Sequence, residues 1–276
     1  MTVSVTCSDG IRLFVDDQGP RHAATIVFAH EFGGDWRTWD GLISHLAMEF
    51  RCVRYAARGF SPSDTPEDLH VYGQERSTED LAEVVDRLGL DRFHLVGCSM
   101  GSFTSLMFAL EAPDRLRCLT LIGCSSGPRD DAERARYRAA LGEELGLLRR
   151  LGGDGAVQWF SSDPAYRRML QKAPEVWRAY LERLRRQSVQ GAVQTLKTVH
   201  WNRRSLFDLE RQLQALRVPT NLIYGEEDHP LVLPTNSFLS EVLPCSQEVK
   251  VPTTGHLVHL EEEQSVLELL SAMRWA

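Results

Sequence analysis

The stretch that decides the fold is Phe93-His-Leu-Val-Gly-Cys-Ser-Met-Gly101. It begins with a short apolar run of strand character, 93–96, and ends in the motif Gly97-Cys98-Ser99-Met100-Gly101. The residues after it, 103–110, have the composition of a helix. A G-x-S-x-G motif between a strand and a helix is typical of a sharp turn that projects a serine hydroxyl above a sheet. The pattern therefore predicts that Ser99 is a nucleophile.

Runs with strand character recur on both sides of this motif, and helical patterns lie between them. The predicted strands are 3–6, 11–16, 25–29, 52–55, 93–96, 118–122, 221–224 and 247–251. One helical pattern contains Leu81, Val84 and Leu88, and we expect Ser77 or Thr78 to be its N-cap. Strands that alternate with helices predict an α/β fold with a mostly parallel sheet and helices on both faces.

The segment 127–213 has a different character, because it shows helical patterns and no convincing strand. Trp177, Tyr180 and Leu184 form part of one amphipathic stripe within it. Such a length is unusual for a connection inside a compact domain. We therefore predict one α/β core, 1–126 and 214–276, interrupted by a helical insertion, 127–213.

Composition excludes several classes of protein. The 276 residues are 43% hydrophobic and 25% charged, which is typical of a globular protein. The net charge is −7 with mixed signs, so we expect no nucleic-acid partner. No apolar run reaches the roughly 18 residues of a membrane span, and the first residues do not resemble a signal peptide. We therefore expect a cytoplasmic protein with no membrane partner; a homodimer is left open.

Cofactor motifs are also missing from the sequence. The six cysteines include no C-x-x-C pair and none at zinc-ligand spacing from a histidine. No glycine-rich phosphate loop follows a strand. We therefore predict reduced thiols, no metal and no cofactor.

A serine nucleophile needs a base and an acid that orients the base. His256 follows the last predicted strand, and Asp228 follows the strand 221–224, so the order Ser99, Asp228, His256 is that of a catalytic triad. Glu226 and Glu227 compete with Asp228, and we interpret them as solvated loop charges. Backbone N–H groups of Phe32 and Met100 are the expected oxyanion-hole donors.

The motifs HEFGG (30–34), GCSMG (97–101), GEEDHP (225–230) and GHLVHLEEE (255–263) together resemble the α/β-hydrolase family in content and order. The loop 55–64 is similar to the family's loop after the fourth strand. The resemblance implies an eight-stranded, mostly parallel sheet flanked by helices. It also implies that the insertion is a helical cap.

Glu31 departs from that family, whose members usually have glycine at this position. A carboxylate pointing inward would oppose anion binding in the oxyanion hole. We expect Glu31 to point away and to pair with a cation such as Arg58. The alternative is that Glu31 tunes the site or positions water.

The resemblance and the serine together imply a serine esterase or lactonase that cleaves a carboxylic ester or lactone through an acyl-enzyme on Ser99. Two further hydrolytic or binding functions stay open: a C–C bond hydrolase of β-diketones or ring-fission products, and a small-ligand receptor. A cofactor-free oxygenase would need the histidine and the acid but not the serine. The expected substrate is small and apolar, and Trp159, Trp177 and Trp201 are candidates for its pocket.

Overall fold

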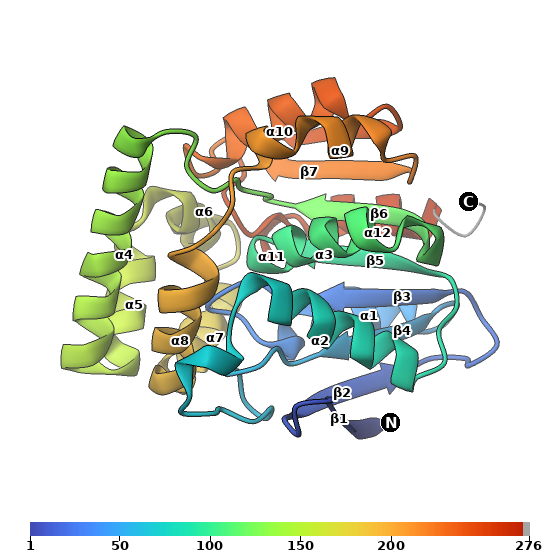
Figure 1. Ribbon diagram of the computed structural model, residues 1–276, viewed down its shortest axis with the longest axis horizontal. Helices are drawn as coiled ribbons and strands as arrows, with labels where there is room; N and C mark the ends of the chain where they lie inside the picture. Colours follow the sequence, from blue (N-terminus) through green and yellow to red (C-terminus); the bar gives the residue numbers. More distant parts are fainter. Residues whose placement is uncertain (273–276) are drawn as a thin grey trace.

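The computed structural model describes residues 1–272. Its eight strands form one sheet in the order β1-β2-β4-β3-β5-β6-β7-β8 (Figure 1). The strands are β1 (Thr2–Thr6), β2 (Arg12–Gln18), β3 (Thr25–Ala29), β4 (Arg51–Tyr55), β5 (Phe93–Cys98), β6 (Leu116–Ile122), β7 (Thr220–Gly225) and β8 (Ser246–Val251). β2 pairs antiparallel with β1 and with β4, and all other neighbours are parallel. The predicted mostly parallel α/β sheet is confirmed.

Helices cover both faces of the sheet. Strand β3 shows why, because its alternate side chains belong to opposite cores: Ile26 and Phe28 to one, Val27 and Ala29 to the other. The first core is shared with α1 (Asp40–Leu46) and α12 (Glu263–Ala272), next to the short α11 (Val258–Glu261). The second is shared with α2 (Gln74–Arg87), α3 (Met100–Glu111), α9 (Glu210–Ala215) and α10 (Val232–Val242).

The expected N-cap of α2 is wrong. The helix begins at Gln74 after Gly73, so Ser77 and Thr78 lie inside it. Their hydroxyl groups donate back to the carbonyls of Gly73 and Gln74, four residues earlier. Serine and threonine can form this bond within a helix as readily as they cap one, and composition does not distinguish the two roles.

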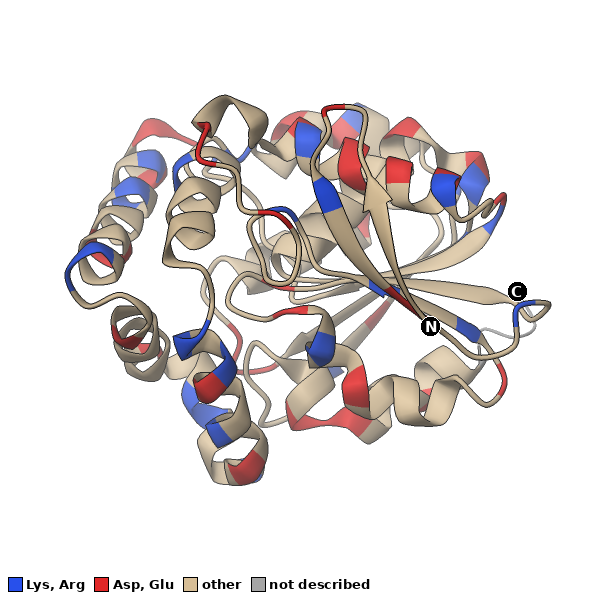
Figure 2. Ribbon diagram, turned by 90° about the horizontal axis from the view of Figure 1, so that it is seen from below, with Lys and Arg blue, Asp and Glu red and all other residues tan. Residues whose placement is uncertain are grey.

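Five of the six α-helices between β6 and β7 form a separate group, and the sixth is α9. The group consists of α4 (Asp131–Leu151), α5 (Gly153–Ser162), α6 (Pro164–Lys172), α7 (Pro174–Arg185) and α8 (Val189–Thr195), and a π-turn, Leu196–His200, continues α8. Figure 1 shows them as a group beside the end of the sheet at which β6 finishes. Basic and acidic residues are interspersed along these helices (Figure 2). Among residues 1–272, no helix is both long and apolar enough to cross a bilayer.

The contact between α3 and β3 depends on Gly101, and this gives a prediction for stability. A Cβ at Gly101 would lie 2.1 Å from the Ala29 carbonyl oxygen. Gly101→Ala should therefore lower the free energy of unfolding by about 1–3 kcal/mol, measured by urea denaturation. Gly142, in the exposed part of α4, has no atom within 4 Å of such a Cβ. Gly142→Ala should instead raise stability by about 0.5–1 kcal/mol; similar effects of both changes would contradict the proposed steric cause.

Candidate active site

Ser99 occupies a strained turn between β5 and α3. Its φ and ψ angles are 51° and −107°, a region that non-glycine residues rarely adopt. Its N–H donates to the carbonyl of Ile122 at the end of β6, at 2.8 Å. The Ser102 hydroxyl donates to the carbonyls of Gly97 and Ile122, and these bonds stabilise the turn. Strand and helix therefore hold Ser99 at the carboxyl end of the sheet.

Asp228 and His256 are in direct contact. The distance from Asp228 Oδ1 to His256 Nδ1 is 2.6 Å, and both side chains are buried. The same carboxylate oxygen accepts the N–H of His229. The competing acids lie elsewhere: Glu226 is exposed, and Glu227 pairs with Arg168. The loop after β7 thus presents Asp228 alone to the histidine.

The charge of Asp228 changes the pKa of His256. Burial opposes protonation of the ring, but the attraction and the hydrogen bond of Asp228 outweigh it and raise the pKa above 6.5. His256 is also fixed through its backbone, because its N–H donates to the carbonyl of Ala165 in α6 at 2.8 Å. The imidazole is therefore oriented from two sides, with Nε2 left for other partners.

Ser99 and His256 line one cavity of about 460 Å³, a volume suited to a small ligand. Within residues 1–272, no hydrogen bond joins the Ser99 hydroxyl to His256. Such contacts are often long without substrate and shorten in the complex. The cavity wall also includes aromatic, apolar, polar and charged side chains: Phe32, Ser125, Glu144, Trp159, Phe160, Tyr166, Leu196, His200, Arg203 and His229.

Phe32 and Met100, the two expected oxyanion-hole donors, come from different parts of the fold. Met100 is the first residue of α3, so its N–H belongs to the unpaired end of a helix. Phe32 lies in the loop after β3. Neither N–H donates to a protein acceptor anywhere in the described chain, which leaves both available to an oxyanion.

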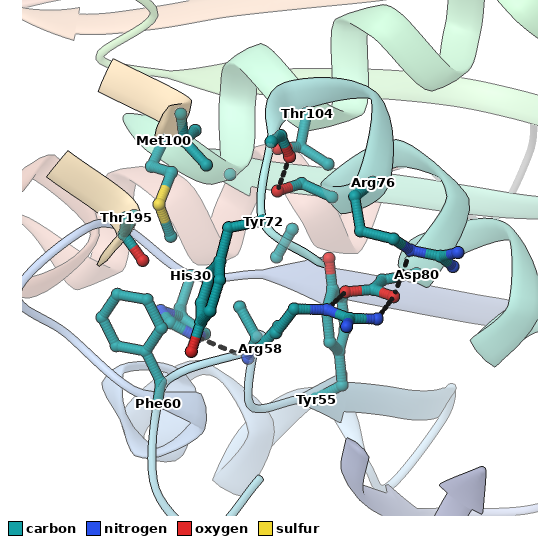
Figure 3. A pocket seen from close by; sticks show the side chains of 16 residues that line it. His30, Tyr55, Arg58, Phe60, Tyr72, Arg76, Asp80, Met100, Thr104 and Thr195 are labelled. Atoms are coloured by element: carbon teal, nitrogen blue, oxygen red, sulfur yellow. Dashed lines mark hydrogen bonds and ion pairs between the residues drawn. The ribbon is translucent and has the colours of Figure 1, made fainter. Parts of the chain in front are cut away.

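His30 holds the loop that carries Phe32 in place through two hydrogen bonds of its ring. The His30 Nδ1–H donates to the carbonyl of Glu31 at 2.8 Å, and its Nε2 accepts the N–H of Ala57 at 3.0 Å. Figure 3 shows the second of these bonds, beside the ion pair of Arg58 with Asp80. Burial lowers the pKa of His30, which keeps the ring neutral as both bonds require.

The same loop is held from the other side by Gln187, just after α7. Its Nε2 donates to the carbonyls of Gly33 and Gly34, at 2.7 and 2.6 Å. A side chain from the α4–α8 group therefore sets the path of the backbone next to Phe32. Nothing in the sequence indicates this role, since a glutamine beside a run of arginines is unremarkable there.

Comparison with known proteins agrees with this geometry. Residues 24–263 match the model of the alpha/beta hydrolase fold family. The chain belongs to the α/β-hydrolase family. It is 29% identical over 272 residues to the "Putative 2-succinyl-6-hydroxy-2,4-cyclohexadiene-1-carboxylate synthase" of Bacillus subtilis (strain 168), covering 98% of this chain and 97% of that protein.

Two further relatives carry the names of hydrolases. 3-oxoadipate enol-lactonase 1 of Acinetobacter baylyi is 24% identical, over 98% of this chain and 96% of its own. The structure of a thermophilic esterase from Thermogutta terrifontis superposes with a TM-score of 0.83 at 25% identity, over 99% of this chain and 97% of that one. These similarities support hydrolase activity for this α/β-hydrolase.

The expected pairing of Glu31 with Arg58 is wrong. Arg58 binds Asp80 and Asp9 instead. Glu31 is fully buried, and its Oε1 accepts the Thr38 hydroxyl at 3.0 Å. His259 Nε2 lies 2.9 Å from the same hydroxyl and 3.8 Å from Glu31 Oε2. Glu31 therefore does point away from the cavity, but into a small polar cluster behind the oxyanion loop.

Burial keeps this cluster close to neutral. It raises the pKa of Glu31 to about 7 and lowers the pKa of His259 to about 3. Cys98 completes a trio with Glu31 and His259 whose potential ligand atoms lie within 4.8 Å of one another, and burial raises the pKa of its thiol. Because Thr38 already hydrogen-bonds the glutamate and the histidine, we assign no metal to the trio.

The buried Glu31 gives a prediction for stability against pH. Its folded pKa of about 7 lies above the ordinary value of 4.5, so the stability that it contributes at low pH is lost as pH rises from about 4.5 to about 7. The expected loss is about 3 kcal/mol. Glutamine does not titrate, so the Glu31→Gln variant should not show this loss. The free energy of unfolding of the variant minus that of the wild type should therefore increase by about this amount between pH 5 and pH 8.

Urea denaturation at the two pH values measures the difference. The matched control is Glu226→Gln, which changes an exposed glutamate. Parallel pH dependences of the wild type and Glu31→Gln would show that the folded protein does not retain a proton on Glu31.

The three candidate pocket tryptophans have different surroundings. Trp159 lines the cavity. Trp177 does not: it is buried and stacks on Tyr180 with ring centroids 5.9 Å apart. Trp201 is also outside the lining, and Arg138 lies over its ring. Aromatic residues at helical spacing do not reveal which of them face a ligand, because that depends on how the helices pack.

Proposed function

We propose that this α/β-hydrolase cleaves a carboxylic ester or lactone through an acyl-enzyme on Ser99. The observation that carries the proposal is the 2.6 Å contact between Asp228 and His256, at the wall of a cavity that also contains Ser99. An acid that holds a histidine next to a strained serine is the arrangement that activates a hydroxyl nucleophile.

The proposed reaction has two halves. The Ser99 hydroxyl attacks the substrate carbonyl while His256 Nε2 takes its proton, and the Phe32 and Met100 N–H groups bind the resulting oxyanion. His256 then gives the proton to the leaving alkoxide. A water molecule, deprotonated by His256, attacks the acyl-enzyme; the bond from Ser99 Oγ to the acyl carbon breaks, His256 returns the proton to Oγ, and the acid product leaves. In a lactone the leaving alkoxide is part of the same molecule.

The preference for an ester or lactone is supported by the names of the enol-lactonase and the esterase. The apolar part of the substrate would lie against Phe32, Trp159, Phe160 and Leu196, beneath a cap made by α4–α8. The same triad could cleave a C–C bond of a β-diketone, and a receptor would bind a ligand without turnover. Turnover measured with esters, lactones and β-diketones separates these functions.

Intact-mass spectrometry after exposure to a fluorophosphonate tests the proposal. We expect one label per chain, located at Ser99, and we expect the unlabelled protein to turn over neutral esters or lactones. Turnover restricted to β-diketones would favour the C–C hydrolase. A folded wild-type protein that takes no label would contradict an activated serine.

A further inference from the structure

Arg203 is a buried cation on the wall of the cavity that contains Ser99. Only 6% of the surface of Arg203 is exposed. Nη1 donates to the Ser125 hydroxyl at 2.9 Å, and Nη2 lies 3.4 Å from His200 Nδ1. The buried Nε–H has no partner. In the part of the chain that the structure describes, no carboxylate oxygen lies within 4.0 Å of its nitrogens.

This lack of an acidic partner sets Arg203 apart from the other buried arginines. Arg51 pairs with Asp17, Arg54 with Asp16, and Arg58 with Asp80. A buried charge is normally paired, because desolvation penalises it heavily when it is alone. Arginine also remains protonated at any ordinary pH, so it cannot escape the penalty by losing its proton.

The acids that share the cavity do not replace the missing partner. Burial and the nearby Asp163 raise the pKa of Glu144 to about 8, so Glu144 is largely uncharged at neutral pH. Asp163 caps α6 by accepting the N–H of Ala165, and Glu133 pairs with Arg129. Among the described residues, the guanidinium of Arg203 therefore has a hydroxyl and an imidazole as its hydrogen-bonding neighbours and no ionised carboxylate within 4.0 Å.

The position of Arg203 relative to the serine turn is fixed. Its guanidinium carbon lies 5.1 Å from the ring centroid of Phe103, whose N–H donates to the Ser99 carbonyl. The flanking backbone is tied to the chain that leaves β6: Gly127 N–H donates to Arg204 O at 3.0 Å, and Leu206 N–H to the Ser126 hydroxyl. Two hydrogen-bonded segments thus hold Arg203 next to the turn that carries Ser99.

We propose that Arg203, together with Ser125 and His200, binds a carboxylate carried by the substrate whose carbonyl reacts at Ser99. This inference rests on the proposed hydrolase function and narrows its substrate class. A planar guanidinium matches a carboxylate through paired N–H donors, and the Ser125 hydroxyl can add a third. The substrate is then a small, mainly apolar ester or lactone with one acidic end, rather than a wholly apolar one.

The experiment compares charged and neutral esters in matched variants. The acyl pair is mono-p-nitrophenyl adipate and p-nitrophenyl hexanoate; the alcohol pair is 4-(hexanoyloxy)benzoate and phenyl hexanoate. In Arg203→Gln we expect kcat/KM for the charged member of at least one pair to fall about 10- to 100-fold, the range for losing a hydrogen bond to a charged group. The neutral members should change less than about threefold.

Arg204→Gln is the matched control, because it removes an adjacent but exposed arginine. It should leave the ratio of charged to neutral kcat/KM unchanged. Arg203→Lys keeps the charge but not the paired donors, so it should give an intermediate ratio, and it replaces Arg203→Gln if the latter does not fold. Charged-to-neutral ratios that stay within about twofold of wild type in the folded Arg203 variant, for both pairs, would overturn the inference.

Adipate alone separates failure of the inference from failure of the proposed function. Binding to the native state raises Tm whether or not Ser99 reacts. Adipate should raise the Tm of the wild type and of Arg204→Gln, and should have little effect on Arg203→Gln. An unreactive Ser99 with this pattern intact would remove the hydrolase proposal and keep the anion site. A reactive Ser99 with no dependence on Arg203 would do the reverse.

Discussion

Replacing Ser99 by alanine is expected to lower kcat/KM for the best ester or lactone by about 10⁴-fold or more. The change removes the attacking oxygen and leaves the cavity, His256 and the oxyanion donors in place. The residual rate would then reflect binding and oxyanion stabilisation alone. Steady-state kinetics with each purified variant measures the effect, and thermal denaturation shows whether the fold is kept.

Cys98→Ala is the control for this substitution. Cys98 is adjacent to Ser99 and is the other nucleophilic side chain of the motif, but it is fully buried, and burial raises the pKa of its thiol. We expect its variant to keep activity within about tenfold of wild type. Full turnover in Ser99→Ala would contradict the acyl-enzyme and favour chemistry that needs only the histidine and the acid, such as that of a cofactor-free oxygenase.

Replacing Asp228 by asparagine is expected to lower kcat/KM by about 10³- to 10⁴-fold, because the amide can stabilise the wrong tautomer of His256 and cannot offset its positive charge. The pH dependence gives a second readout. In the wild type, His256 acts as a base only when deprotonated, so activity should fall as pH drops through a pKa above 6.5. Without the carboxylate that pKa falls, and the acid limb of the profile should move to lower pH.

Glu226→Gln and Glu227→Gln are the controls for Asp228, because they change the two acids beside it in the same loop. The structure places both away from His256, and we expect both variants to retain the wild-type pH profile. A large loss in either of them, with normal activity in Asp228→Asn, would assign the third member of the triad to a different residue.

Sequence reasoning located the parts of the site that depend on local pattern and chain order. The turn around Ser99 is encoded by its own five residues and by the flanking strand and helix. Asp228 and His256 each follow a recognisable strand, and parallel strands bring their carboxyl ends to one edge of the sheet. Their contact could therefore be predicted, while their catalytic roles stay predictions.

The remainder depends on packing between segments far apart in the chain. Gln187 and Arg203 lie among arginine-rich helical sequence, in which nothing distinguishes a residue that faces the cavity from one that faces water. Glu31 has one partner nearby in the chain, Thr38, and another in α11, His259, more than 200 residues away. Of the three candidate pocket tryptophans, Trp159 lines the cavity, whereas Trp177 and Trp201 pack within or beside the helices, and the sequence does not distinguish them for the same reason.

The contacts of Gln187 and Ala165 have a consequence for how this enzyme would select its substrate. One holds the backbone beside a proposed oxyanion donor, and the other holds the backbone of His256, so both halves of the proposed reaction centre are positioned by the α4–α8 group, of which α4, α5 and α6 line the cavity. A molecule too large for the cavity would displace α6, and with it α7, which packs on α6, so that the donors and the base would be disordered together. Discrimination by size should consequently appear in kcat, with oversized molecules bound but left intact.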